Sequence, residues 1–328
     1  MTGPVRTRLA PTPSGYLHLG NAWSFVLTWL MARSRGGTLH LRIDDLDGAR
    51  LRQDYLEDIF SGLAWLGLDY DSGPRDSADF QANYSQRLRR DAYQSALERL
   101  MFRETGAGLR GVEPRVYACA CTRGDIRRAA GPGAVPGYYP GTCRSRGWDL
   151  TDVRKVLRLR VESDREVTLR DANGGDIRLR PAETLGDFVI RKGQGEPAYQ
   201  LGSVVDDASM GIGLVVRGRD LLDSSGAQGL LAEHLGYAGF LRAEFLHHGL
   251  FTGADGDKLS KSAGDVSLRA MRERMEGPSE VYRHFASLLG MDPRGISRAV
   301  DLLPGFDPGR IPTGPHPFAD FASRVGWA

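Results

Sequence analysis

The chain is poor in cysteine and has no long hydrophobic run. Its 328 residues include three cysteines, all between Cys119 and Cys143, which excludes the dispersed disulfide framework of a secreted domain. No apolar run reaches the roughly 18 residues that a membrane-spanning helix needs, so we expect no membrane partner. The N-terminal "MTGPVRTRLAPTPSG" lacks the uninterrupted apolar core of a signal peptide. We therefore expect a cytoplasmic protein.

Lysine is also scarce. The formal net charge of +2 is too small to indicate a nucleic-acid partner by itself, and of 43 basic residues only four are lysines: Lys155, Lys192, Lys258 and Lys261. The last two lie three residues apart in "GDKLSKS" (256–262). Two ammonium groups at this spacing on a loop can clamp a polyphosphate whose charge develops during transfer, although an exposed polar loop explains them equally well at this point.

The first third of the chain alternates strands and helices. Residue patterns of period two and period 3.6 predict a strand at 5–10, a helix at 21–33, a strand at 39–45 and helices at 52–66 and 84–101. This order is typical of a parallel sheet with crossover helices. We therefore predict an α/β fold.

The middle of the chain interrupts this pattern. Residues 107–150 are rich in Gly, Pro, Cys and Arg, and segments that alternate with a period of two follow at 155–161, 166–180 and 187–192. Within the second segment, "DANGGD" predicts a hairpin turn because Asn-Gly tolerates positive φ angles. The region therefore has the pattern of a β-rich insertion.

The strand and helix pattern resumes after the insertion. It predicts strands at 199–207 and 213–222, a helix at 228–236, helices up to about Leu289 and a poorly structured tail from 303. We therefore predict four parts: the first half of the α/β domain at 1–106, the insertion at 107–186, the second half at 187–250, and a loop with a short helical C-terminal region at 251–328.

One histidine precedes the first predicted helix in "GYLHLGN" (15–21). At a helix N-terminus the ring N–H of His18 can donate to phosphate oxygens, reinforced by the helix dipole and free backbone N–H groups. Gly15 and Gly20 let the backbone approach a nucleotide closely. A single histidine at such a position is more often a capping or surface residue, so the motif needs support from elsewhere in the chain.

That support comes from the order of the two motifs. "HLGN" early and "KLSKS" late, in the two halves of a split α/β sheet, resemble the paired signatures of class I aminoacyl-tRNA synthetases. The resemblance implies a Rossmann-type core that uses ATP and Mg²⁺. It implies ATP-binding residues His18, Gly20, Asn21 and Lys261, and catalytic residues His18, Lys258 and Lys261.

Further segments resemble the glutamyl-tRNA synthetase catalytic core, from about residue 5 to 265. They are "RLAPTPSGYLHLGN" (8–21), "RIDDLDGAR" (42–50), "WLGLDYD" (65–71), "YQLGSVVDD" (199–207) and "VVRGRDLL" (215–222). The resemblance implies an amino-acid pocket formed by Arg8, Ala10, Thr12, Asp44, Tyr199 and Arg217. Glutamate carries two carboxylates and one ammonium, so guanidinium forks and an anion suit it.

Asp44 departs from the family pattern. Glutamyl enzymes usually have Glu at this position, whereas glutaminyl-tRNA synthetases carry Asp. Either carboxylate can pair with the substrate ammonium, so the choice between glutamate and glutamine stays open on this residue. We predict glutamate because Arg8 and Arg217 together suit two carboxylates, and a neutral amide would leave a buried guanidinium without a full counter-charge.

The three cysteines predict a metal site. Zinc prefers four ligands, most often Cys and His, yet the insertion contains no histidine. The residues alone leave Tyr138, Tyr139 and Asp125 as candidates for the fourth ligand, and three incidental thiols remain an alternative. The cluster resembles the zinc site of glutamyl-queuosine tRNA(Asp) synthetases, and this resemblance implies Zn²⁺ held by Cys119, Cys121, Tyr139 and Cys143.

The segment after Ser262 is short for the anticodon-binding region of a full glutamyl-tRNA synthetase, so we expect no such domain. The short glutamyl-queuosine enzymes attach glutamate to queuosine in the anticodon loop of tRNA(Asp), and the resemblance implies that reaction here. One alternative is a glutamyl- or glutaminyl-activating enzyme that charges another acceptor: a tRNA 3′ end, a carrier protein or a small molecule. Another is a tRNA-binding protein without catalysis, against which the intact "HLGN" and "KLSKS" argue. We expect a monomer.

Overall fold

The computed structural model describes residues 4–48, 51–102, 115–253 and 267–327. Its helices are α1 (Leu19–Arg33), α2 (Gln53–Leu66), α3 (Ser77–Asp79), α4 (Arg90–Phe102), α5 (Arg123–Ala130), α6 (Pro181–Thr184), α7 (Tyr199–Ser209), α8 (Leu222–Leu235), α9 (Ala238–Leu241), α10 (Leu268–Arg274), α11 (Ser279–Leu288), α12 (Ala299–Leu302) and α13 (Phe318–Arg324). Its strands are β1 (Arg6–Leu9), β2 (Thr38–Leu41), β3 (Val116–Cys119), β4 (Val156–Leu159), β5 (Val167–Asp171), β6 (Asp176–Leu179), β7 (Val189–Arg191), β8 (Leu214–Gly218), β9 (Glu244–His248), β10 (Phe251–Thr252) and β11 (His316–Pro317). Among these residues no helix is both long and apolar enough to cross a membrane.

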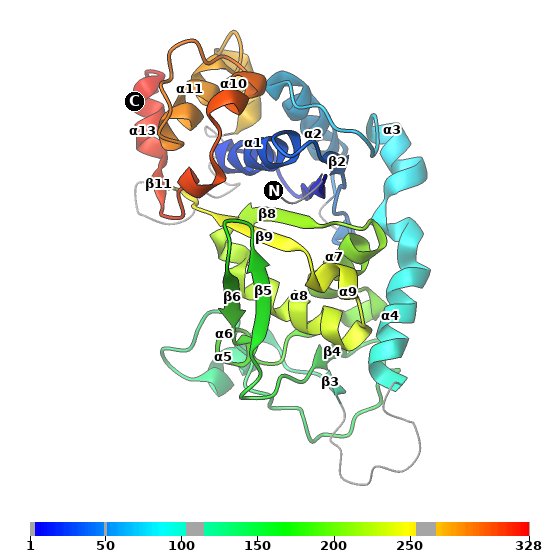
Figure 1. Ribbon diagram of the computed structural model, residues 1–328. Coiled ribbons are helices and arrows are strands. Elements are labelled where there is room, and N and C mark those ends of the chain that lie inside the picture. Colours follow the sequence, from blue (N-terminus) through cyan, green and yellow to red (C-terminus); the bar gives the residue numbers. More distant parts are fainter. Residues whose placement is uncertain (1–3, 49–50, 103–114, 254–266, 328) are drawn as a thin grey trace.

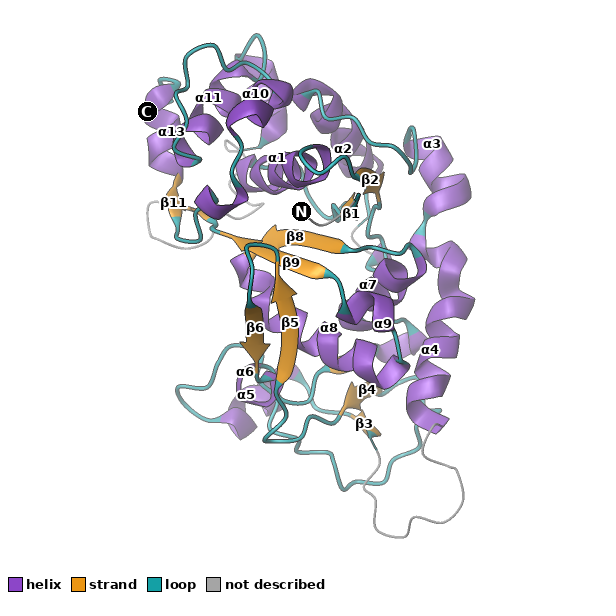
Figure 2. Cartoon of the chain, viewed as in Figure 1, coloured by secondary structure: helices purple, strands orange, loops and turns teal. Residues whose placement is uncertain are grey.

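Parallel strands form the centre of the molecule, between a helical end and a β-rich end (Figures 1 and 2). β1 pairs with β2 in parallel, and β9 pairs in parallel with both β8 and β5. β1 also lies beside β8, because the Gly213 N–H donates to the Arg6 carbonyl at 2.9 Å and the Thr7 hydroxyl donates to the Leu214 carbonyl at 2.8 Å. The predicted α/β architecture is confirmed.

Helix α1 is buried along most of its length. Its residues are apolar on nearly every side, and Trp23, Val26, Leu27 and Leu30 have no exposed surface. A helix of this composition is stable only when it is covered all round. Figure 1 shows α1 between the strands and the group of helices α2, α10, α11 and α13, and the start of α1 is therefore held rigidly against the sheet.

The middle of the chain contributes to two sheets. β3, β4 and β7 form an antiparallel sheet of their own. The predicted hairpin is confirmed as β5–β6, with positive φ angles at Gly174 and Gly175 in its turn. This hairpin pairs with β9, so it extends the central sheet and not the β3–β4–β7 sheet. Residues 107–150 also include more regular structure than their composition predicts, because β3 and α5 lie there.

The prediction of a strand at 199–207 is wrong, because this segment forms helix α7. Leu201, Val204 and Val205 lie at helical spacing, and all three are buried in the second hydrophobic core. The adjacent valines favour a strand by propensity alone. Burial of one apolar face against α4 and α8 outweighs that preference.

The prediction of a poorly structured tail from residue 303 is also wrong. β11 pairs in parallel with β10, and Ile311 and Phe321 are buried. The Gly249 N–H donates to the Pro312 carbonyl at 2.8 Å, and the His316 N–H donates to the Leu250 carbonyl at 2.8 Å. Prolines and glycines here shape an ordered segment that runs along β10.

Asp58 joins three distant segments beside the start of α1. Its carboxylate accepts the Leu17 N–H at 2.9 Å and pairs with Arg272 of α10 at 2.6 Å. The Leu268 N–H donates to the Leu17 carbonyl at 2.7 Å, so α10 begins directly beside the "HLGN" turn. The two halves of the chain therefore meet at this turn.

We expect Asp58→Ala to lower the free energy of unfolding by about 2–3 kcal/mol, since it leaves the Leu17 N–H and the partly exposed Arg272 without their shared acceptor. Asp58→Asn keeps one acceptor oxygen and should lose less. Urea unfolding followed by circular dichroism measures both. A change below about 0.5 kcal/mol for the alanine variant, the range of ordinary surface substitutions, would mean that Asp58 does not stabilise this junction.

Candidate active site

A cavity of about 340 Å³ opens where β1 and β8 end and α1 begins. Ligands of open α/β sheets bind at such carboxyl ends. Nine residues predicted from the sequence line this cavity: Arg8, Ala10, Thr12, His18, Gly20, Asn21, Asp44, Tyr199 and Arg217. The predicted Lys258 and Lys261 lie outside the described residues.

His18 lies at the start of α1 on the cavity wall and is 8% exposed. Its backbone N–H donates to Asn21 Oδ1 at 3.0 Å, which closes the turn. Gly20 packs against the imidazole: a Cβ there would lie 3.0 Å from His18 Cε1 and 3.1 Å from Nδ1. A side chain at this position would therefore press on the ring, and the start of α1 offers backbone N–H groups to an anion.

Asp207 pairs with two arginines at the opposite side of the cavity. Arg8 Nε donates to Asp207 Oδ1 at 2.9 Å, and Arg42 Nη1 donates to the same oxygen at 2.6 Å. The Asp207 side chain is only 1% exposed. Burial opposes the ionised form, but Arg8 and Arg42 outweigh it and lower the pKa of Asp207. Asp207 therefore stays ionised and holds both guanidinium groups.

Asp44 shares Arg42 with Asp207. Arg42 Nε and Nη2 donate to the two Asp44 oxygens at 2.7 and 3.2 Å. Burial raises the pKa of Asp44 in spite of Arg42. Its side chain keeps 12% of its surface exposed and lines the cavity, so an oxygen remains accessible to a cationic group.

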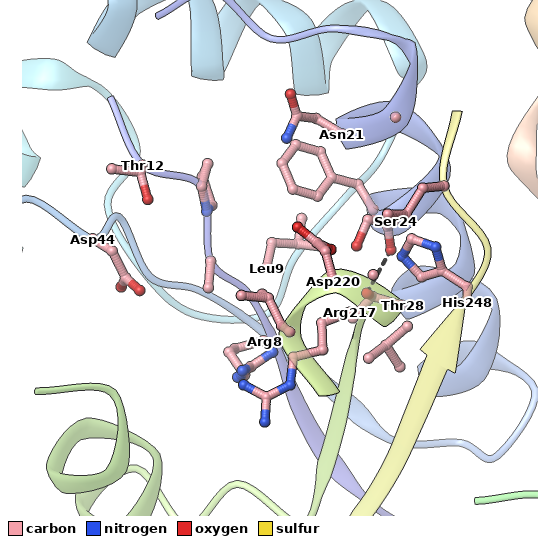
Figure 3. A pocket seen from close by; sticks show the side chains of 18 of the residues that line it. Arg8, Leu9, Thr12, Asn21, Ser24, Thr28, Asp44, Arg217, Asp220 and His248 are labelled. Atoms are coloured by element: carbon pink, nitrogen blue, oxygen red, sulfur yellow. Dashed lines mark hydrogen bonds between the residues drawn. The ribbon is translucent and has the colours of Figure 1, made fainter. Parts of the chain in front are cut away.

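Arg217 is held differently. Its Nη1 donates to Gln228 Oε1 at 2.8 Å and its Nη2 donates to Ser225 Oγ at 2.5 Å, both on α8. Figure 3 shows the guanidinium groups of Arg8 and Arg217 next to each other, with Asp44 on a separate segment. Burial lowers the pKa of Arg217, yet a guanidinium remains protonated in proteins. The cavity thus presents two adjacent cations that suit carboxylates.

Sequence reasoning missed the residues that hold these arginines. Arg42, Asp207, Ser225 and Gln228 are buried partners of the predicted residues. Asp207 stood in the quoted "VVDD", but only its contact with Arg8, 199 positions away, reveals its role. Gln228 and Ser225 carry no motif, and no sequence signal could have found them.

The three predicted cysteines form a second cluster, in the part of the chain around β3. Their sulfur atoms lie within 4.8 Å of one another, and Cys121 Sγ is 3.4 Å from Cys143 Sγ. Tyr139 Oη lies 3.3 Å from Cys119 Sγ and 3.7 Å from Cys121 Sγ. Tetrahedral zinc with thiolate and oxygen ligands places its donors about 3.5–3.8 Å apart. The predicted donors are thus grouped at spacings close to those of such a site.

The other candidates for the fourth ligand are engaged elsewhere. The Asp125 carboxylate accepts the Thr122 N–H at 2.8 Å and the Thr122 hydroxyl at 2.7 Å, which caps α5. Tyr138 lines a separate hollow with residues of α5. The Arg158 Cζ atom lies 3.7 Å from the centre of the Tyr139 ring, a cation–π contact that holds this ring in place.

Comparison with known proteins assigns the fold to a family. The model of the family described as tRNA synthetases class I (E and Q), catalytic domain, matches residues 4–129 and 142–302. The chain belongs to this family. The match confirms the prediction of a class I synthetase ligase, and its gap at 130–141 spans the segment that carries Tyr139.

Relatives of two kinds resemble this synthetase-family chain. The glutamyl-Q tRNA(Asp) synthetase of Symbiobacterium thermophilum is 40% identical over 94% of this chain and 94% of its own length, and that of Nitratidesulfovibrio vulgaris is 37% identical over 95% and 94%. A glutamate–tRNA ligase of an Anaeromyxobacter species is 38% identical, over 86% of this chain but 57% of its own length. The predicted resemblance to glutamyl-queuosine tRNA(Asp) synthetases is confirmed.

A solved structure gives the same result for the fold. The glutamate tRNA ligase of Elizabethkingia meningosepticum, in complex with its amino acid, superposes with a TM-score of 0.76 at 27% identity. The match covers 98% of this chain and 68% of that protein. The predicted Rossmann-like catalytic core is therefore confirmed.

Proposed function

We propose that this protein activates glutamate with ATP and transfers it to queuosine in the anticodon loop of tRNA(Asp). The observation that carries the proposal is the single cavity in which the His18 turn faces Arg8 and Arg217. One side suits phosphates and the other suits a dicarboxylic amino acid. The relatives named glutamyl-Q tRNA(Asp) synthetase, which match over nearly their whole length, support the choice of acceptor.

Activation needs positioning and charge stabilisation. The glutamate α-carboxylate attacks the α-phosphorus of ATP, and pyrophosphate leaves. His18 and the α1 N-terminus donate to phosphate oxygens, Arg8 and Arg217 bind the carboxylates, and Asp44 accepts from the ammonium. Mg²⁺ bound with ATP would neutralise phosphate charge. In the second step a hydroxyl of the acceptor attacks the carbonyl of the mixed anhydride, and AMP leaves.

We also propose that Lys258 and Lys261 contact the phosphates during the first step. Both flanks of the segment that carries them lie at the cavity: Phe251 lines it, and Ser267 pairs with His18 through a backbone bridge. This anchoring supports a role for the segment at the same site. Negative charge grows on the phosphates in the transition state of this reaction. Two nearby ammonium groups suit that charge.

We expect His18→Ala and Lys261→Ala each to slow glutamate-dependent ATP–pyrophosphate exchange by about 10²–10³, the typical loss of one donor to developing charge. His40→Ala is a matched control, because His40 hydrogen-bonds Ser72 at 2.8 Å outside the cavity. Circular dichroism checks the fold. Near-normal exchange by either variant would remove that residue from the mechanism.

Zinc is proposed at the cysteine cluster, held by Cys119, Cys121, Cys143 and Tyr139. Such a closed set of four ligands would make the ion structural, since no position stays open for a substrate. The Arg158 guanidinium and backbone N–H groups balance the excess negative charge of thiolates and phenolate. The ion would tie the end of β3 to the loop that carries Cys143.

We expect about one zinc per chain in protein purified without chelator, measured by elemental analysis. Tyr139→Phe should weaken zinc affinity at least about tenfold in a chelator competition, because even outer-shell changes cost 10–100-fold. Tyr138→Phe is the matched control and should retain the metal. If both variants retain zinc equally, Tyr139 is not a ligand and water is the fourth ligand. If the wild-type protein contains no metal, the zinc site itself is excluded.

The acceptor of the activated glutamate is the most specific part of the proposal. Arg123 and Arg127 lie exposed on α5, and Arg146 lies exposed beyond Cys143, whereas Arg128 pairs with Asp125 and Arg144 pairs with Asp187. Exposed arginines of this kind can hold loop phosphates but carry no base identity. Specificity would come from the queuosine diol fitting near the adenylate.

Glutamate as the amino acid, the monomeric state and the cytoplasmic location also stay predictions.

We expect labelled glutamate to reach the anticodon loop of queuosine-containing tRNA(Asp). Ribonuclease cleavage after charging locates the label. The same tRNA without queuosine is the matched control and should stay uncharged. Label on the 3′-terminal adenosine, or equal charging of both tRNAs, would contradict queuosine as the acceptor. Either result would favour the alternative in which the enzyme charges a different acceptor.

A further inference from the structure

The acceptors of Arg217 are uncharged, unlike those of the other arginines at the cavity. Arg8 and Arg42 donate to the Asp207 carboxylate, whereas Arg217 donates to the amide oxygen of Gln228 and the hydroxyl of Ser225. Within the described residues, Arg217 Nε has no hydrogen-bond partner. Arg217 thus reaches the cavity in a fixed position, held by acceptors that carry no charge.

The side chains that pack against Ser225 and Arg217 from this side are uncharged as well. Ser225 Oγ lies 2.7 Å from His247 Nε2, and Ser225 and Gln228 have at most 1% of their surface exposed. Burial, together with Arg217, lowers the pKa of His247 to about 3, so its ring is uncharged near neutral pH. Phe245 covers another side, with its ring centre 5.5 Å from Arg217 Cζ. A buried charge in such a setting favours an anionic ligand.

Arg217 therefore differs from its neighbours in its direct partners. Arg8 and Arg42 share the Asp207 carboxylate, whereas the groups that hold Arg217 carry no charge. The side chain of glutamate ends in a carboxylate, which can pair with Arg217, whereas that of glutamine ends in an amide, which cannot neutralise it.

We propose that Gln228 and Ser225 are positioning residues that hold Arg217 without neutralising it, and that Gln228 thereby determines selection of an amino acid with one net negative charge. This inference rests on the proposed activation of glutamate and names the residue that sets its selectivity. The side chains of Gln and Glu have the same size, and both accept from a guanidinium. Only the amide of Gln leaves the positive charge of Arg217 available to pair with a carboxylate of the substrate.

The test compares Gln228→Glu with Gln228→Met. The first keeps an acceptor and adds a charge, and the second removes the acceptor without adding one. For each variant, calorimetric titration gives the dissociation constants of glutamate and glutamine, and pyrophosphate exchange gives KM and kcat. Gln94→Glu is the matched control, because it makes the same change on the exposed side of α4.

We expect Gln228→Glu to weaken glutamate binding about 10- to 100-fold, with the change chiefly in KM. Its effect on glutamine binding should be much smaller, so the variant should lose the preference for glutamate. Gln228→Met should weaken glutamate binding yet keep glutamate preferred, and Ser225→Ala should act in the same way. The Gln94 variant should match the wild type. Thermal unfolding checks that each variant is folded.

A Gln228→Glu variant that keeps the wild-type preference would overturn the inference, and so would a wild type that binds glutamine as tightly as glutamate. If Gln228→Glu does not fold, loss of the glutamate preference in Gln228→Met would overturn it, because that variant still gives Arg217 no charged partner. Failure of the proposed function has a different signature. The wild type would then bind glutamate but show no pyrophosphate exchange.

Discussion

The buried carboxylate of Asp207 is the constraint on which the geometry of the cavity depends. It receives hydrogen bonds from Arg8 in β1 and from Arg42 just after β2, so two strands and α7 are held at fixed distances. A buried charge is tolerated only with its partners in place, so these elements cannot shift independently. Its neighbour Asp206 anchors α7 on the other side, through Arg89 and the Tyr93 hydroxyl. The part of the cavity that carries Arg8 and Arg42 is therefore held in place by buried ion pairs.

The part of the cavity that carries His18 depends on a different principle, close packing around one helix. Helix α1 is covered on nearly all sides, and its N-terminus projects the His18 turn into the cavity. The Asp58 carboxylate and the Leu17–Leu268 hydrogen bond fix the same turn from outside. The two sets of groups, for which we propose phosphate and carboxylate binding, are thus held at the same cavity by independent means.

Asp187 has a comparable role for the cysteine cluster. It has no exposed surface, and it accepts from the Tyr117 hydroxyl at 2.5 Å and from Arg144 at 2.6 Å. Tyr117 precedes Cys119 in β3, and Arg144 follows Cys143, so one carboxylate holds both cysteine-bearing segments. The cluster is consequently ordered by protein contacts as well as by any metal that binds there.

The sequence by itself determined the features that depend on neighbouring residues. The helix at 21–33, the β5–β6 hairpin and strands β1, β2 and β8 follow from periodicity and turn residues, whereas β9 was not predicted. Of the nine predicted residues at the cavity, the glycine-flanked turn before α1 indicated three and the resemblance to glutamyl-tRNA synthetases indicated six. The three cysteines were equally visible from their spacing.

Tertiary structure alone decided the features that depend on distant residues. Residues 199–207 became a helix because burial of Leu201, Val204 and Val205 outweighed the strand propensity of the valines. The tail from 303 became ordered because its backbone found partners at Gly249 and Leu250. Arg8 and Arg217 look alike in the sequence. Only packing gives the first a buried carboxylate and the second a neutral amide, because an acceptor's charge depends on which side chains the fold brings into contact.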